Sequence, residues 1–132
     1  EVFAALGAPG ARLLAYLLPE VDDRHKVRVL ETIAKIETPY PPENVAACLK
    51  HQDPAVRVAA ALALGAGRMV EGLQPLMISA SDKTWQVRAA VAKALGMIGD
   101  QRALPVLDIL AKDQEGWVAK TAKQTLDLFA GA

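Results

Sequence analysis

The residues with the greatest capacity for chemistry are a cysteine and a histidine near the middle of the chain. Cys48 and His51 are three residues apart and would share one edge of a helix. His25 and Asp53 are conceivable further ligands, so this group is the best candidate for binding a metal ion. His25 comes from a different segment, however, and a thiol beside a core commonly packs as a small apolar group. We therefore expect Cys48 to be packed, and we expect no metal site and no cofactor.

No other constellation of residues points to catalysis. The chain has no glycine-rich phosphate loop, no Gly-x-Ser-x-Gly sequence and no pair of carboxylates matched by a histidine. Those motifs supply the nucleophile, the base or the phosphate cradle on which their reactions depend. We therefore predict no catalytic residue and do not expect the chain to be an enzyme.

Three arginines recur, each directly after a valine: Arg28, Arg57 and Arg88. They could form a basic row for phosphate groups or an acidic peptide. Aspartates stand five residues before a valine at the same place in the pattern: Asp22, Asp82 and Asp113. Carboxylates so placed could pair with the arginines of adjacent segments through charge-assisted hydrogen bonds. We favour this structural role for the arginines.

The composition limits the partners. The chain has 132 residues, with 15 Lys and Arg against 15 Asp and Glu, so its formal net charge is zero. Strong nucleic-acid binding is not expected, because it relies on an excess of positive charge. No apolar run reaches the roughly 20 residues of a membrane span. The single cysteine excludes an internal disulfide, and the 52% of hydrophobic residues are enough for one folded domain.

The valine–arginine pairs belong to an internal repeat. They are Val27-Arg28, Val56-Arg57 and Val87-Arg88, separated by 29 and 31 residues, and Val118 follows after a further 31. Seven residues after each valine comes a second landmark: Ala34-Lys35-Ile36, Ala63-Leu64-Gly65, Ala94-Leu95-Gly96 and Thr125-Leu126-Asp127. Self-similarity with such a period indicates a stacked array of supersecondary units.

Each unit reads as two helices. Apolar residues from Val87 to Leu95 recur at offsets 0, 3, 4, 7 and 8, which is one face of a helix. Asp53 before Pro54 is a helix start, and Gly96 is expected to end its helix with a positive φ. A leucine-rich second helix follows after Asp100. The predicted helices cover residues 1–7, 10–18, 22–37, 42–50, 54–66, 70–80, 84–97, 101–112 and 115–130.

The predicted fold is an all-α solenoid of about four two-helix repeats. The units run approximately over residues 1–21 (partial), 22–50, 51–81, 82–112 and 113–132 (partial), in one domain. The chain begins without an initiator methionine or a secretion pattern, so we expect a fragment of a larger protein and a cytoplasmic location. Apolar surface left open on the terminal units would favour end-to-end self-association.

Several of these residues resemble a known family. Two stretches are similar to the HEAT-like repeats of the phycobilisome-lyase type, which belong to the armadillo-like solenoids. They are Asp53-Pro54-Ala55-Val56-Arg57, and Ala94-Leu95-Gly96 followed by Gly99-Asp100 and Leu104-Pro105. The resemblance implies a right-handed superhelix whose second helices line a concave face. It also implies roles that are mostly in protein binding.

The second helices provide the candidate binding surface. Aligned by the period, three residues of each point away from the leucine core: Glu43, Ala46 and Lys50, then Gln74, Met77 and Ser81, then Pro105, Asp108 and Lys112. Arg12, Tyr16, Trp85 and Arg102 complete the candidate partner-binding set. We expect Tyr16, Met77, Trp85 and Arg102 to contribute most of the binding energy. For Trp85 and Trp117 we favour the interpretation that they plug the junctions between units, with a role as binding anchors as the alternative.

Three functions follow, in order of preference. The first is a noncatalytic scaffold that binds a protein or another domain of its own chain. The second is a subunit of a bilin lyase or isomerase, which would need an apolar groove flanked by cations for the propionates of the pigment. An absorbance titration with phycocyanobilin separates these two. The third, nucleic-acid binding, is disfavoured by the interspersed acids Glu43, Glu71 and Asp108.

Overall fold

The chain forms two layers of helices stacked in sequence order. The computed structural model describes residues 7–131, which contain helices and loops and no strand. The first helices of the units are α3 (Asp23–Ile36), α5 (Pro54–Ala66), α7 (Trp85–Ile98) and α9 (Gly116–Phe129). The second helices are α2 (Ala8–Leu17), α4 (Glu43–Ala47), α6 (Leu73–Ile78) and α8 (Leu104–Leu110). The prediction of an all-α solenoid is confirmed, whereas the predicted helix 1–7 lies outside the described residues apart from Gly7.

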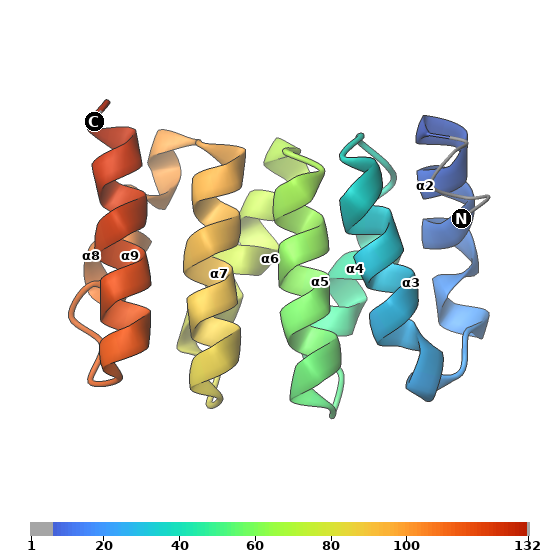
Figure 1. The fold of residues 1–132 in the computed structure, drawn as a ribbon, viewed down its shortest axis with the longest axis horizontal. Helices are drawn as coiled ribbons and strands as arrows, with labels where there is room; N and C mark the ends of the chain where they lie inside the picture. The colour runs from blue at the N-terminus through green and yellow to red at the C-terminus, as the bar shows by residue number, and fades with distance from the viewer. Residues whose placement is uncertain (1–6, 132) are drawn as a thin grey trace.

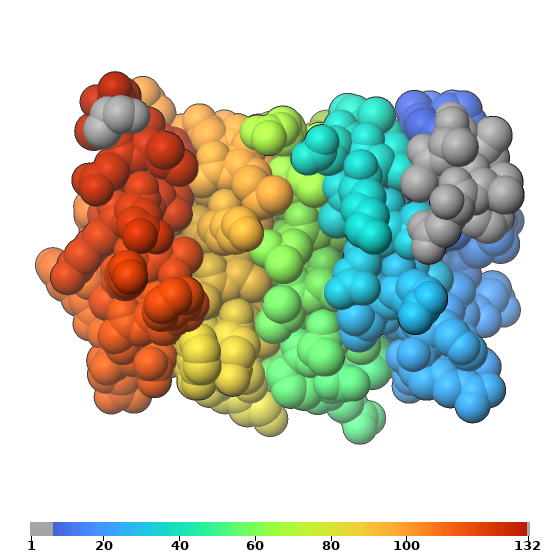
Figure 2. All heavy atoms as spheres, in the orientation of Figure 1, coloured from blue at the N-terminus to red at the C-terminus, as the bar shows by residue number. Residues whose placement is uncertain are grey.

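The first helices run side by side across one face, with α4, α6 and α8 behind them and with α2 and α9 at opposite ends (Figure 1). Figure 2 shows the same face as successive bands that follow the order of the chain. Short 3₁₀ turns extend or precede the second helices: η1 (Leu18–Glu20), η2 (Cys48–Lys50), η3 (Val70–Gly72), η4 (Ser79–Ser81) and η5 (Gln101–Ala103). At least one end of each second helix therefore continues as a 3₁₀ turn, and the α-helical part of each second helix is short.

The predicted helix starts at Asp53 and Asp100 are confirmed. The backbone N–H of Ala55 donates to the Asp53 carboxylate at 2.9 Å, and Pro54 occupies the first turn of α5. The backbone N–H of Arg102 donates to Asp100 at 2.9 Å. These bonds satisfy N–H groups that have no partner within the helix.

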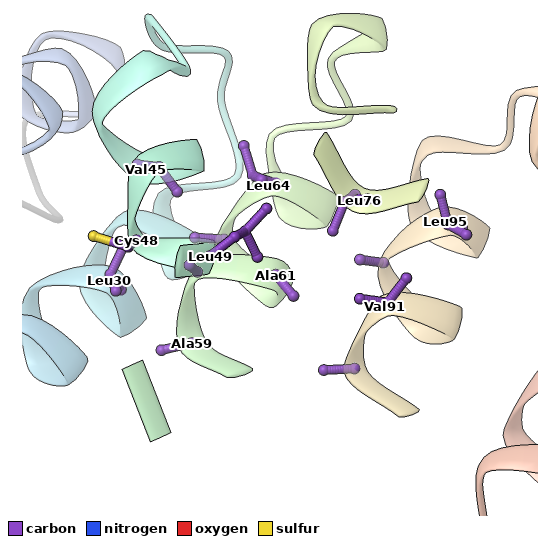
Figure 3. Close-up of a cluster of buried hydrophobic side chains, with 14 of the residues drawn as sticks. Leu30, Val45, Cys48, Leu49, Ala59, Ala61, Leu64, Leu76, Val91 and Leu95 are labelled. Atoms are coloured by element: carbon purple, nitrogen blue, oxygen red, sulfur yellow. The ribbon is translucent and has the colours of Figure 1, made fainter. Parts of the chain in front are cut away.

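The core is built from equivalent residues of successive units. Val56, Val87 and Val118 are fully buried in the first helices, and Val45, Leu76 and Leu107 are fully buried in the second helices. Side chains from α4, η2, α5 and α6 belong to one cluster, in which Cys48 is packed as predicted (Figure 3). Each fully buried leucine or valine stabilises the fold by about 1.5–3 kcal/mol, so apolar contact between helices is the main source of stability.

The prediction that Gly96 ends its helix is wrong. Helix α7 continues through Gly96 to Ile98, and Gly99 ends it with a φ of 71°. Gly96 is needed for another reason, because a Cβ atom there would lie 2.6 Å from Cγ2 of Thr125 in α9. Gly65 has the same role one unit earlier, where a Cβ atom would lie 2.7 Å from Cα of Ala94. These two glycines allow neighbouring first helices to touch.

Helix α3 departs from the predicted repeat by one residue. Val27 is only partly buried and Arg28 is exposed, whereas Val56 and Arg57 are both buried. The fully buried residues of α3 are Leu30 and Ile33. The helix is turned so that these larger apolar side chains face the core, because burying them removes more apolar surface from water.

The close approach at Gly65 predicts a costly substitution. Gly65→Ala should lower the free energy of unfolding by about 1–3 kcal/mol, because the methyl group meets the backbone of Ala94 and forces the helices apart. Urea denaturation measures the change. The matched control is Gly116→Ala, where a Cβ atom meets nothing within 4 Å and helix propensity improves. Equal effects of the two substitutions would contradict the role given to Gly65.

Candidate partner-binding site on the second helices

Arg57, the arginine of the second complete unit, uses all of its side-chain N–H donors within the fold. Arg57 donates from Nε and Nη2 to the Asp82 carboxylate at 2.9 and 3.2 Å. Its Nη1 donates to the carbonyl groups of His51 and Gln52, and Nη2 also contacts Oγ1 of Thr84 at 3.1 Å. A guanidinium group has five N–H donors, and these five contacts use all of them. Arg57 therefore serves the junction between units and is not available to a phosphate group.

The next unit repeats this arrangement. Arg88 donates from Nε and Nη2 to the Asp113 carboxylate at 2.8 and 3.1 Å, and from Nη1 to the carbonyl group of Asp82 at 2.9 Å. The hydrogen bonds from Arg88 hold the pKa of Asp113 below its ordinary value. The predicted pairing of arginines with loop aspartates is thus confirmed at two junctions, with Asp82 and with Asp113.

At the junction between α3 and α5 the prediction is wrong. Arg28 is exposed and forms no ion pair with the residues that the structure describes. Among the described residues, the ion-pair partners of Asp22 are Arg24 at 3.9 Å and His25 at 4.0 Å, both of its own helix. The rotation of α3 that buries Leu30 accounts for this, because it turns Arg28 outward.

His51 takes the place of the aspartate at this first junction. Its Nδ1 accepts a hydrogen bond from the backbone N–H of Asp53 at 3.0 Å. Asp82 and Asp113 accept the same bond from the residue two positions later. The Nε2 of His51 lies 3.1 Å from the carboxylate of Asp23 in α3, whose pKa is lowered by the hydrogen bonds from His51 and Lys26. The positions of the two groups are therefore exchanged, with the carboxylate on the helix and the hydrogen-bond donor on the loop.

The outward face of the second helices carries a row of equivalent residues. We call it the outer row: Tyr16, Ala47, Ile78 and Ile109, each 31 residues from the next. Tyr16, Ile78 and Ile109 are 76%, 64% and 71% exposed, while Leu128 and Trp117 of α9 are exposed to 68% and 58%. The three residues of the outer row are distinguished by their equivalent places in separate units. Of the outer row, only Tyr16 belongs to the candidate set predicted from sequence. The spacing of 31 residues from Tyr16 was the signal that would have found Ile78 and Ile109.

Most of the predicted site residues flank the outer row. Arg12, Glu43 and Gln74 are exposed and precede members of the row by one helical turn, whereas Lys50 and Lys112 are exposed and follow by one turn. Met77 is half-buried, and Asp108 is exposed beside Ile109. Exposure and spacing from the outer row assign seven of the predicted residues to this face: Arg12, Tyr16, Glu43, Gln74, Met77, Asp108 and Lys112. Lys50 lines crevices at the loop edge with Asp23, Asp53 and Lys83.

Trp85 and Arg102 lie outside this group. Trp85 is the first residue of α7 and lines a crevice of about 380 Å³ with Lys83, Arg88 and Glu115, at the loop edge of the first helices. Arg102 lies in η5, where its guanidinium is 2.7 Å from Asp100 and lowers the pKa of that carboxyl to about 2. Trp85 therefore lies in a crevice at the loop edge and Arg102 pairs with Asp100, so neither side chain is part of the outer row.

A groove of about 590 Å³ separates α3 from α5 on the first-helix layer. Its lining is mostly apolar, with Val27, Val58 and Leu62, and carries one acid and one base, Glu31 and Lys35. Lys35 stands 30 residues before Gly65, the offset that also aligns the buried residues of α3 with those of α5. Lys35 is exposed and lines the groove, whereas Gly65 is buried against α7.

The described residues offer no further centre for chemistry. Residues 7–131 contain no group of three or more His, Cys, Asp or Glu side chains placed to hold a metal ion. Cys48 is buried, and that burial raises the pKa of its thiol. Within the same range, every helix is too short or too polar to cross a bilayer.

A family comparison agrees with this geometry. The family model of HEAT repeats matches residues 41–127, which extend from just before α4 into α9 and include both glycine contacts. The chain belongs to the HEAT-repeat family. HEAT repeats are generally interaction scaffolds. No curated protein matches the chain.

The buried contacts of Arg57 predict a large effect on stability. Arg57→Ala should lower the free energy of unfolding by about 3 kcal/mol or more, because it leaves the largely buried Asp82 without its partner. Arg57→Lys should restore little, since an ammonium group cannot reproduce the five N–H contacts. Arg28→Ala is the control and should change stability by less than about 0.5 kcal/mol. Thermal and urea unfolding measure all three; a stable Arg57→Ala protein would contradict the structural role.

The lowered pKa of Asp113 predicts a pH dependence. The ion pair with Arg88 contributes fully above the ordinary aspartate value near about 4, and its contribution is lost as the pH falls through the lower native value. The free energy of unfolding should therefore fall from pH 5 to about 2.5, and the fall should be smaller in Arg88→Ala. Lys93→Ala, which removes an exposed cation, should keep the wild-type slope. Equal slopes in all three proteins would exclude this contribution.

Proposed function

We propose that this HEAT-repeat chain is a noncatalytic scaffold whose second-helix face binds a protein or another domain of its own chain. The observation that supports this proposal is the outer row. Tyr16, Ile78 and Ile109 expose large apolar side chains at equivalent places in separate units. Large exposed apolar groups that line up across a surface are typical of interaction sites.

The surroundings of the outer row also suit a protein partner. Near Ile78 the neighbouring outward residues are the uncharged Gln74, Met77 and Ser81. Charged residues lie toward the sides: Glu43 on α4, Lys50 in η2, Asp108 on α8 and Lys112 in the turn after α8. An apolar centre within a polar rim is the usual anatomy of a protein–protein interface. The mixed signs of the rim disfavour nucleic acid, which needs a positive surface.

The site is tested by photocrosslinking in the full-length protein in its own cells. Benzoylphenylalanine is introduced at Ile78 or Ile109, and at Lys93 or Gln124 as exposed controls on the first-helix layer. Discrete adducts are expected from positions 78 and 109 and not from 93 and 124, because binding energy is concentrated in buried apolar contacts. Analysis of the adducts by mass spectrometry distinguishes a separate protein from another domain of the same chain.

A second variant controls for nonspecific capture. Ile109→Asp should remove the adduct formed at position 78, because a buried carboxylate disfavours the same interface. Circular dichroism and the thermal midpoint should stay unchanged, since Ile109 is 71% exposed. Adducts from 93 and 124 equal to those from 78 and 109 would place the binding surface elsewhere.

A further inference from the structure

We propose that the array bends at one place, the junction between α3 and α5. In this motion α2 and α3 move as one body against a second body made of α4 to α9, and the groove between α3 and α5 closes or widens. The inference goes beyond the proposed function, because it concerns a motion of the chain itself and needs no partner. Three observations carry it: the residues that α3 turns toward α5, the contacts at the ends of this junction, and the packing of the remaining helices.

The residues that α3 turns toward α5 differ from those of the other junctions. Helices α5 and α7 each have an arginine, an alanine and a glycine spaced by four residues on the face toward the next first helix: Arg57, Ala61 and Gly65, and Arg88, Ala92 and Gly96. Counted back by 30 residues from α5, the same places in α3 hold Val27, Glu31 and Lys35, and all three line the groove. Helix α3 therefore has neither the guanidinium that crosses a junction nor the small residues that let two helices touch.

Tyr40 holds one end of the α3–α5 junction. Its side chain is buried, and its hydroxyl donates to the carbonyl group of Ala63 in the last turn of α5 at 2.7 Å. Its backbone N–H donates to the sulfur of Met69 at 3.3 Å. On the second-helix side, the amide of Asn44 in α4 donates to the carbonyl group of Ala15 in α2 at 3.0 Å. These contacts join the two bodies away from the groove, so we assign the pivot of the motion to them.

The contact at the other end of the junction is weak. Nε2 of His51 lies 3.1 Å from the carboxylate of Asp23 in the first turn of α3, and the Asp23 side chain is 74% exposed. At the next two junctions the side chains of Asp82 and Asp113 are only 11% exposed in their pairs with arginine. A contact between exposed groups contributes little to stability. The first turn of α3 is therefore the part that moves most against α5.

The remaining helices form the second body. Helix α4 packs on α5, α6 on α7 and α8 on α9, while α2 packs on α3. The close contacts at Gly65 and Gly96 join α5, α7 and α9, and so they also join the second helices that pack on them. Tightly packed elements move as rigid bodies, and the motion concentrates where the packing is interrupted. Among the first helices that the structure describes, α3 and α5 are the neighbours separated by such an interruption.

Distances between two spin labels test the proposal. One pair of labels is placed at His25 of α3 and Gln86 of α7, and the matched pair at Ala55 of α5 and Trp117 of α9. All four residues are exposed in the first turn of their helices, at steps of 30 or 31 residues, and each pair spans two junctions. The labels are attached through p-acetylphenylalanine, so that Cys48 is left unchanged.

The expected result is a difference in the width of the two distance distributions. Double electron–electron resonance on the full-length protein should give a distribution at least about twice as wide for the 25–86 pair as for the 55–117 pair. Only the first pair spans the junction between α3 and α5. One label of each pair lies on an end unit of the described array, so the two pairs are matched in that respect as well.

A double variant distinguishes bending from fraying of α3. Glu31→Ala with Lys35→Gly gives α3 the alanine and the glycine that α5 and α7 carry at these places, so that α3 can approach α5. The 25–86 distribution should then narrow to the width of the 55–117 distribution. Arg28→Gly is the control, because Arg28 is exposed outside the groove lining, and this variant should stay broad. Circular dichroism verifies that each variant folds.

Two outcomes would overturn the proposal. Equal widths for the two label pairs in the chain without groove substitutions would show that no single junction bends. A broad 25–86 distribution that a folded double variant leaves unchanged would show that the breadth comes from fraying. The comparison of the two label pairs needs no change in the groove, so it decides the matter even if the double variant is unfolded. Neither measurement involves a partner, so the scaffold function and its crosslinks are tested separately.

Discussion

The close approach of neighbouring first helices at Gly65 and Gly96 is the contact on which the stacking of the units depends. Gly65 of α5 lies against Ala94 of α7, and Gly96 of α7 lies against Thr125 of α9. A methyl group at either glycine would lie within 3 Å of the next helix. The short separation brings Arg57 to Asp82 and Arg88 to Asp113 across the junctions. It also fixes the spacing of the second helices behind, which aligns the outer row. The tight packing of α5, α7 and α9 thus accounts for the regular placing of the second helices that pack on them, α4, α6 and α8.

The buried ion pairs act on the loops between units more than on the helices. Asp82 and Asp113 each accept a hydrogen bond from the backbone N–H of the residue two positions later, and each also pairs with an arginine of the preceding unit. One carboxylate therefore shapes the turn and joins two successive units. His51 keeps the first of these tasks and exchanges the second for a contact with Asp23. Loops of the same shape can therefore be made with either a carboxylate or an imidazole as the acceptor of the backbone N–H. Such pairs contribute to the specificity of the stacking, because an unpaired charge at a wrong junction would be costly.

The sequence was most informative where a feature depends on local spacing. The two-helix period, the cap at Asp53 and the arginine–aspartate pairs all follow from residues at fixed offsets. The period and the cap were confirmed, and the pairs were confirmed at two junctions, Arg57 with Asp82 and Arg88 with Asp113, but not for Arg28 and Asp22. Gly96 was misread, since glycine can serve either a helix end or a close contact, and only the position of Thr125 distinguishes the two. The rotation of α3 was missed for a similar reason, because the Val27-Arg28 pair matches the repeat while Leu30 and Ile33 determine which face is buried. Ile78 and Ile109 follow the period of Tyr16, but their exposure depends on the neighbouring helices.

The segment 82–112 contains both halves of the junction. Through Asp82 and Ala94 it receives the arginine and the glycine of the preceding unit, and through Arg88 and Gly96 it offers the same two groups to the following one. A tandem duplication of these 31 residues would therefore insert a complete two-helix unit whose two sides already match the neighbouring units. An array built in this way can lengthen during evolution by whole units without any compensating substitution, and each added unit would enlarge the second-helix face by one helix.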